Sequence, residues 1–171
     1  AANNTAVGYD SLGANTTGTD NVAVGAFAGD AITTSSSNVA VGIRALSGET
    51  KGTNNVAIGR DALAVQNTTS AVVSANTAVG ALAGAAVTTG VQNTLIGGLA
   101  GDAITTANNN TALGFNSLGV NTTGNSNVAI GYAALDANTT ASDNTAVGNS
   151  ALTTNTTGTF NTAVGARSLN A

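Results

Sequence analysis

The residues of this chain that could do chemistry are few, and two aspartates in a repeated hexapeptide are the most suggestive. Asp30 and Asp102 each stand in the sequence Gly-Asp-Ala-Ile-Thr-Thr. Aspartates that recur in a repeat protein are typical of calcium sites, which need several oxygen ligands from adjacent turns. The equivalent of Asp102 one repeat earlier is Ala85, so the ligands do not accumulate from turn to turn. We therefore predict that the chain holds no metal.

Three aromatic residues are candidates for contact with a receptor. Tyr9, Phe115 and Tyr132 occupy one position of a repeat, and the same position also accepts Arg60 and Asn149. A shared core does not tolerate such an assortment, so we expect this position on the outer surface. The aromatics there could contact a sugar or a protein receptor, although single exposed aromatics without a role are common.

The composition excludes most catalytic chemistry. The chain has no histidine and no cysteine, so it lacks the commonest general base, any thiolate and any disulfide. Its four basic and eight acidic residues form no run of one sign, which leaves nucleic acid nothing to hold. The longest stretch without a polar side chain, 78–87, is about half as long as a membrane helix needs. We predict no enzyme, no catalytic residue, no cofactor, no nucleic-acid partner and no membrane insertion within this segment.

These residues must be positioned by a repeat. The motif Asn-Thr/Val-Ala-Val/Ile-Gly, with Leu95 and Leu113 as variants, recurs ten times at intervals of 17 residues, except for one interval of 21. We number the columns of the repeat from its asparagine, so that Asn4 occupies column 1. Residues 1–171 form a single repeat array, with a four-residue insertion within 67–75 that is either a binding loop or a tolerated insertion. The ten coils begin at Asn4, Asn21, Asn38, Asn55, Asn76, Asn93, Asn110, Asn127, Asn144 and Asn161.

The repeat predicts an all-β fold, a parallel β-solenoid or β-roll of ten 17-residue coils. Seventeen residues are too few for a pair of helices, and β-branched residues with glycine punctuation disfavour helix. We expect two short strands per coil, in columns 1–4 (as in 127–130) and columns 6–9 (as in 132–135). Each strand would pair in parallel and in register with its copy in the next coil.

Two columns do not vary. The asparagines of column 1 are predicted to form a hydrogen-bonded ladder or turn, which satisfies polar groups that would otherwise be buried without partners. The glycines of column 5 are predicted to turn the corner between the strands, through a positive φ or a close backbone approach. They are Gly8, Gly25, Gly42, Gly59, Gly80, Gly97, Gly114, Gly131, Gly148 and Gly165.

Volume is exchanged between three other columns. Column 9 is leucine in seven coils and glycine in three, at Gly29, Gly84 and Gly101. The three glycine coils gain apolar residues at column 7 and column 12, so we predict that columns 7, 9 and 12 border one shared space.

Column 4 is aliphatic in every coil and is predicted to be buried. Column 3 is alanine in nine coils, which predicts a narrow contact on the opposite face. Arg44 and Asp61 share a column in consecutive coils and should form an exposed ion pair.

The motif also carries a resemblance. The pentapeptides 21–25, 38–42, 55–59 and 127–131, each followed by a segment with alanine or serine, resemble the head repeats of trimeric autotransporter adhesins, the YadA-like head. They are also similar to repeats in some bacteriophage tail fibres. The coil here is longer than the typical head repeat. The resemblance implies a left-handed roll, a homotrimer with two further copies as partners, an extracellular place on a cell surface or virion fibre, and adhesion to a glycan or protein receptor.

The thinness of one coil gives a separate reason to expect a homo-oligomer. Each coil offers few large aliphatic side chains against the entropy of ordering its backbone, so a second subunit would supply missing contacts. Because the chain begins and ends inside a repeat, we expect it to be part of a longer polypeptide. Two other functions stay open: ice binding through the interrupted file of threonines in column 2, and stacking of the end coils into filaments.

Overall fold

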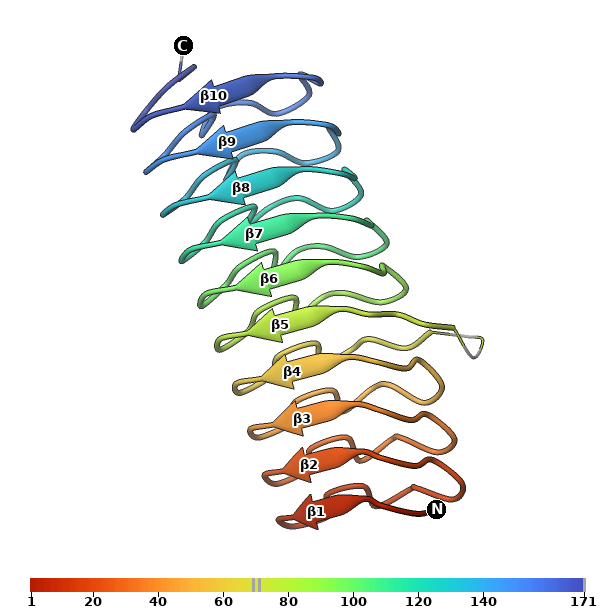
Figure 1. Cartoon of the computed structure of the whole chain (residues 1–171). Helices are drawn as coiled ribbons and strands as arrows, with labels where there is room; N and C mark the ends of the chain where they lie inside the picture. Colours follow the sequence, from red (N-terminus) through yellow and green to blue (C-terminus); the bar gives the residue numbers. More distant parts are fainter. Residues whose placement is uncertain (69, 71, 171) are drawn as a thin grey trace.

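The computed structural model of the chain is a β-solenoid, described here for residues 1–68, 70 and 72–170. The described residues form one sheet of ten parallel strands that follow each other in chain order, so the predicted fold class is confirmed (Figure 1). No helix in these ranges could span a membrane. The strands are β1 (Thr5–Val7), β2 (Val22–Val24), β3 (Val39–Val41), β4 (Val56–Ile58), β5 (Thr77–Val79), β6 (Thr94–Ile96), β7 (Thr111–Leu113), β8 (Val128–Ile130), β9 (Thr145–Val147) and β10 (Thr162–Val164).

Each strand pairs with its own copy in the next coil. Ala112 lies opposite Ala129 and Leu113 opposite Ile130, and β-branched or aliphatic residues in columns 2 and 4 favour this pleated backbone. The insertion does not disturb the register, because Val56 of β4 still pairs with Thr77 of β5. Two residues of the insertion predicted within 67–75, Thr69 and Ala71, lie outside the described residues.

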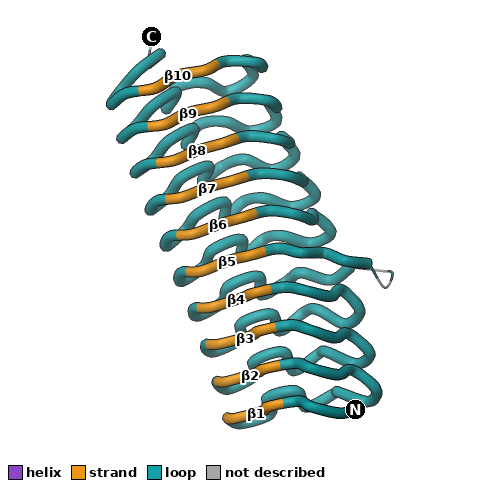
Figure 2. Tube along the Cα trace, in the orientation of Figure 1, coloured by secondary structure: helices purple, strands orange, loops and turns teal. Residues whose placement is uncertain are grey.

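The second strand predicted for columns 6–9 is wrong. In every coil these columns form turns (Figure 2), and columns 7 and 9 both have positive φ, as in Ala133 (φ 50°) and Leu135 (φ 53°). Left-handed backbone at alternate residues cannot continue a β-strand. The coils nevertheless remain hydrogen-bonded along this segment, since Ala133 N–H donates to Phe115 O at 3.1 Å and Leu135 N–H donates to Ala151 O at 3.0 Å.

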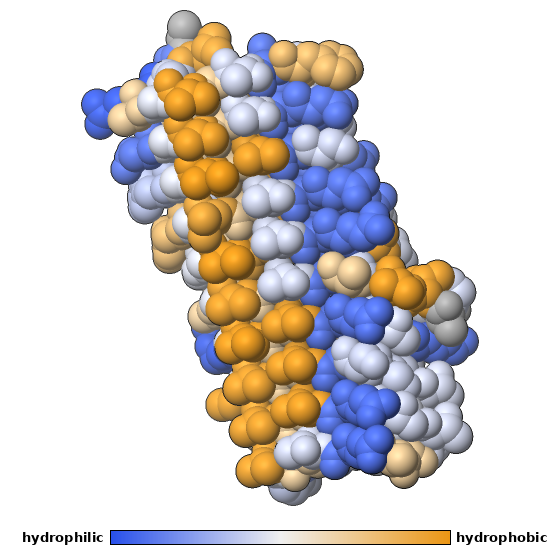
Figure 3. Space-filling view, in the orientation of Figure 1, coloured by the Kyte–Doolittle hydropathy of each residue, from blue (hydrophilic) through white to orange (hydrophobic). Residues whose placement is uncertain are grey.

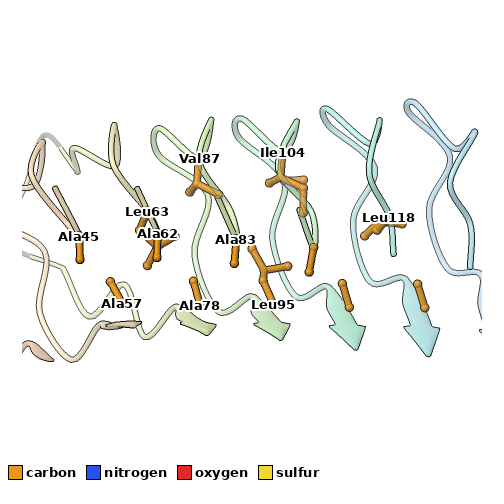
Figure 4. Packing of buried hydrophobic residues seen from close by; sticks show 14 of the residues in the cluster. Ala45, Ala57, Ala62, Leu63, Ala78, Ala83, Val87, Leu95, Ile104 and Leu118 are labelled. Carbon is orange, nitrogen blue, oxygen red and sulfur yellow. The ribbon is translucent and has the colours of Figure 1, made fainter. Parts of the chain in front are cut away.

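The interior lies between the inward face of the sheet and the turn segments. The alanines of column 3 point inward from the strands and are buried in every coil except the first, as in Ala57 and Ala129. Columns 8 and 9 close the interior from the other side, as Ala62 and Leu63 do (Figure 4). The prediction that column 4 is buried is therefore wrong for the single chain: alternation along the strand sends column 3 inward and column 4 outward, where Leu113 is 44% exposed.

The shared space predicted for columns 7, 9 and 12 exists in part. A Cβ on Gly101 (column 9) would lie 2.8 Å from Ile104 Cδ1 (column 12), so these two columns do compensate each other. Column 7 does not take part, because Phe27 points outward and is 37% exposed. The volume is filled instead by Leu95 of β6, whose side chain reaches toward the turns that carry Val87 and Ile104 (Figure 4).

Leu95 fills the space that two glycines leave open, and its loss should be costly. A Cβ on Gly84 would lie 2.8 Å from Leu95 Cδ1, and one on Gly101 would lie 2.8 Å from Leu95 Cδ2. We expect Leu95→Ala to lower the free energy of unfolding by about 2–5 kcal/mol, because it opens a cavity in a site that cannot collapse. Urea denaturation measures this loss. Leu99→Ala, at the outward column 7, is the control, and equal losses for the two variants would contradict the packing described.

Candidate functional site

The asparagines of column 1 form an unbroken ladder. At each of nine steps the backbone N–H of one asparagine donates to Oδ1 of the asparagine in the preceding coil, and the step from Asn93 to Asn110 measures 3.0 Å. In most coils Nδ2 donates across the coil to the carbonyl of column 15, as Asn93 does to Ala107 O at 2.9 Å. The eight inner asparagines are buried. One side-chain amide therefore makes a hydrogen bond across its own coil and also accepts one from the backbone of the next coil.

Column 12 holds a second file of buried polar side chains, whose role was not predicted from the sequence. Asn138 Nδ2 donates to Asn121 Oδ1 at 3.0 Å, and Asn121 Nδ2 donates to Gly124 O at 2.9 Å. The signal was available, because this column is polar wherever column 9 is leucine. The side chain of column 12 lies beneath the following turn and supplies its hydrogen bonds.

Glu49 is the most unusual member of this file. Its side chain is fully buried, and Oε1 accepts hydrogen bonds from the backbone N–H groups of Thr50, Lys51 and Gly52 at 2.7–2.9 Å. Gln66 Nε2 donates to Oε2 at 2.8 Å. Donation from three backbone amides is what a buried carboxylate needs when no cation lies beside it. Glu49 thus anchors the coil that precedes the insertion.

The corner glycines combine both predicted properties. Gly97 has φ +132°, and a Cβ there would lie 2.5 Å from the carbonyl oxygen of Gly114 in the next coil. Gly165, in the last coil, has nothing nearer to such a Cβ than Ser168 Cβ at 4.0 Å. Glycine at column 5 is therefore required by the approach of the next coil as well as by its own backbone.

The predicted Arg44–Asp61 pair forms, but it is less exposed than expected. Arg44 Nε donates to Asp61 Oδ1 at 2.7 Å, and Arg60 Nη1 donates to Oδ2 at 2.6 Å. The aspartate is buried while both arginines are exposed. The hydrogen bond from Arg44 lowers the pKa of the Asp61 carboxyl below its ordinary value.

The candidate receptor aromatics all lie on the outside. Tyr9, Phe115 and Tyr132 are 74%, 52% and 56% exposed. Phe115 and Tyr132 stack in neighbouring coils with ring centroids 6.1 Å apart, and Tyr9 meets Phe27 edge to face at 5.3 Å. Aromatic residues in adjacent coils thus hold each other in place and present their outer surfaces to solvent.

The aspartates of the hexapeptide are partly buried. Oδ1 of Asp30 and Oδ1 of Asp102 are buried and accept no hydrogen bond from the described residues. Desolvation raises the pKa of both carboxyls above the ordinary aspartate value. Within the described ranges no cluster of three acidic side chains that could hold a metal ion is found.

The outward face of the sheet is uniform along its whole length. Column 4 contributes valine, isoleucine or leucine, and column 2 contributes threonine or valine, so neither column carries a charge in any coil. Figure 3 shows the apolar file of column 4 running over the strands from one end of the stack to the other, beside the mixed file of valines and threonines in column 2. We call columns 2 and 4 the strand face and the side that carries columns 7, 10 and 11 the turn face. Sequence, register and exposure together give the strand face a continuous apolar file at column 4, flanked by uncharged residues at column 2.

The fold defines the chain as a β-solenoid repeat protein. No protein-family model, no curated protein and no solved structure matches the chain.

Removing one inner amide from the ladder should destabilise the stack. Asn93→Ala leaves the buried N–H of Asn110 and the carbonyl of Ala107 without partners, and each such group costs about 1–3 kcal/mol. Asn161→Ala is the matched control, since no further asparagine follows it in the ladder. We expect chemical denaturation to show a loss of stability several times larger for Asn93→Ala, and comparable losses would contradict the ladder as a stabilising element.

Asp102 should make stability depend on pH. Its carboxyl has a raised pKa in the folded chain, mainly from burial and also from the charge of Asp136. The folded state therefore binds the proton more tightly, and the associated stability is lost as pH rises through the folded-state pKa. We expect Asp102→Asn to be more stable than the parent at pH 7 and to lose this advantage below pH 3.8, the ordinary aspartate value. Thermal unfolding across pH measures this difference, with exposed Asp143→Asn as the control; a pH-independent difference would contradict it.

Proposed function

We propose that this chain is a structural and adhesive segment of an extracellular trimeric fibre, carried on a cell surface or a virion. The observation that carries the proposal is the strand face: an uncharged apolar file that spans every coil of an otherwise polar rod. Monomeric soluble proteins seldom leave such a continuous apolar strip uncovered. Two further copies of the chain, set around a common axis, would cover it.

The composition of the strand face fits a copy of itself better than a different partner. Its side chains repeat at the spacing of the coils, about 4.8 Å, so an identical rod presents a matching surface at every step. An interface around a rotation axis also closes, which limits growth to a defined oligomer. The resemblance of the pentapeptides to adhesin head repeats points to three copies.

The shape of the molecule supports a mechanical role. Nine successive strand pairings stacked at about 4.8 Å give a rod roughly 43 Å long, and its hydrogen bonds continue through both the strands and the turns. A rod of this kind projects binding elements away from a surface, and three identical copies of each element allow avidity. Tyr9, Phe115 and Tyr132 are candidates for receptor contact on this rod.

One observation favours ice binding as a second candidate. Six threonines of column 2 lie in register on the flat strand face, at Thr5, Thr77, Thr94, Thr111, Thr145 and Thr162. Valines interrupt the file at Val22, Val39, Val56 and Val128, and a trimer built on the strand face would bury all of them. Thermal hysteresis of the purified chain distinguishes the two functions.

The proposal predicts a trimer that depends on column 4. We expect the chain to sediment with three times the mass of its 16.3 kDa monomer. The double substitution Ile96→Lys with Ile130→Lys should weaken assembly by at least about 100-fold, equivalent to about 2.8 kcal/mol, because it buries unpaired charge between the copies. Sedimentation velocity with circular dichroism measures both assembly and folding.

The control places a single lysine on the turn face. Val120 is an exposed aliphatic residue in column 11, and Val120→Lys should leave the trimer intact. A parent chain that sediments as a folded monomer would overturn the proposal. Equal loss of assembly in the two lysine variants would also overturn it.

A further inference from the structure

We propose that a groove on the turn face of the second to fourth coils binds one uncharged pyranose ring of a glycan. The groove has a volume of about 470 Å³, within the range of small-molecule sites. Its principal side chains are Phe27, Asp30, Arg44, Ser47, Val65 and Asn67. The inference rests on the proposed adhesive function, to which it adds the chemistry of the receptor and a binding place distinct from Tyr9, Phe115 and Tyr132.

Phe27 supplies the apolar surface that a sugar ring needs. It stands at column 7, where no other coil carries an aromatic residue, and the edge-to-face contact with Tyr9 at 5.3 Å supports its ring. The face of an aromatic ring is electron-rich and attracts the slightly positive C–H groups that line one side of a pyranose. A flat, half-exposed ring beside polar groups is therefore suited to a saccharide.

Asp30 supplies a carboxylate oxygen that has no hydrogen-bond partner among the described residues. Its Oδ1 is buried and accepts no hydrogen bond from any residue in the described ranges. A buried carboxylate oxygen without a donor is costly, and because Asp30 lines the groove, the hydroxyl groups of a ligand there would lie beside this carboxylate. Burial also raises the pKa of this carboxyl.

Arg44 and Asn67 supply donors on the same groove. Arg44 is held by its Nε, which donates to Asp61 at 2.7 Å, and no described residue accepts a hydrogen bond from its two terminal nitrogens. Asn67 Oδ1 accepts a hydrogen bond from Thr50 Oγ1 at 2.9 Å, which fixes the amide and leaves Nδ2 able to donate. A ring with several hydroxyl groups can use an acceptor and two donors at once.

The charges around the groove favour an uncharged ligand. Arg44 and Arg60 both pair with Asp61, and the negative charge of Asp10 lies close enough to Asp30 to raise the pKa of its carboxyl. An acidic sugar would meet the unpaired oxygen of Asp30, and a cationic ligand would meet Arg44. A neutral hexose or N-acetylhexosamine avoids both repulsions.

The groove remains open in the proposed fibre. Its residues occupy columns 7, 10, 11 and 13, on the side of the coil opposite the strand face, and the interior lies between the two (Figure 4). A trimer that meets through columns 2 and 4 therefore leaves three copies of the groove exposed. Weak binding to each ring would be strengthened by avidity.

The chain contains its own control for this site. The hexapeptide of Asp30 recurs at Asp102, whose Oδ1 is also buried and has no hydrogen-bond partner in the part of the chain that the structure describes. There Leu99 takes the place of Phe27, and Gly119 takes the place of Ser47 in the following coil. The second copy thus has the carboxylate without the aromatic ring or the hydroxyl.

The experiment combines saturation-transfer NMR, which detects binding, with ¹H–¹⁵N correlation spectra of the whole chain, which locate it, and uses the methyl β-glycosides of glucose, galactose, mannose and N-acetylglucosamine as probes. We expect at least one glycoside to bind, with amide shifts at Ser47, Gly48 and Val65. Phe27→Ala and Asp30→Asn should each weaken binding at least tenfold. Phe160→Ala, which removes an exposed ring far from the groove, and Asp102→Asn should change it less than twofold.

Two results would overturn the inference: absence of binding of all four glycosides to the folded chain, or binding whose amide shifts lie outside the groove. The amide shifts keep the test decisive if Asp30→Asn does not fold. Sedimentation of the same samples separates this inference from the proposed function. A trimer that binds no sugar would contradict only the proposed glycan site. A monomer that binds sugar at the groove would contradict only the proposed trimeric fibre.

Discussion

The hydrogen bond from the backbone N–H of one column 1 asparagine to the side-chain oxygen of the previous one is the interaction on which the stack depends. It occurs at every step, including the step from Asn55 to Asn76 across the insertion. Because the acceptor is a side chain of fixed length, each strand must start directly above the start of the strand in the preceding coil. Successive strands therefore keep the same register. The strand pairings, the glycine contacts and the filling of the interior all require that register.

Much of this arrangement could be predicted from the sequence, because ten copies of the repeat can be aligned and each residue compared with its nine equivalents. Invariance at column 1 and column 5 indicated positions under a shared constraint, and the 17-residue period indicated the coil. The turns in columns 6–9 could not be predicted in the same way. Leucine at column 9 is a residue type that is common in strands, yet Leu135 adopts a positive φ of 53°. Nothing in the sequence indicates that the surrounding coils hold this leucine in the left-handed region.

The same limit explains the error about column 4. Side chains alternate between the two faces of a strand, and when both faces are apolar the sequence does not show which face points to the interior. Size was the relevant signal: alanine at column 3 fits a coil that is too thin for two facing leucines. The exception, Leu95, occurs where Gly84 and Gly101 vacate column 9. Compensation across the interior, rather than along one segment, therefore identifies the residues that face inward.

The two sides of the coil differ in how much variation they accept, and this difference follows from the packing. Columns 2 and 4 stay aliphatic or threonine in all ten coils, whereas columns 6, 7 and 10 hold aromatic, charged, amide and small residues. Column 7 is free to vary because its positive φ turns the side chain outward, away from columns 8 and 9. A ring at Phe27 and an arginine at Arg44 therefore change the surface without altering the interior. A solenoid built this way keeps one side constant, as the proposed contact with copies of itself requires, and leaves the side chains of the opposite side free to vary.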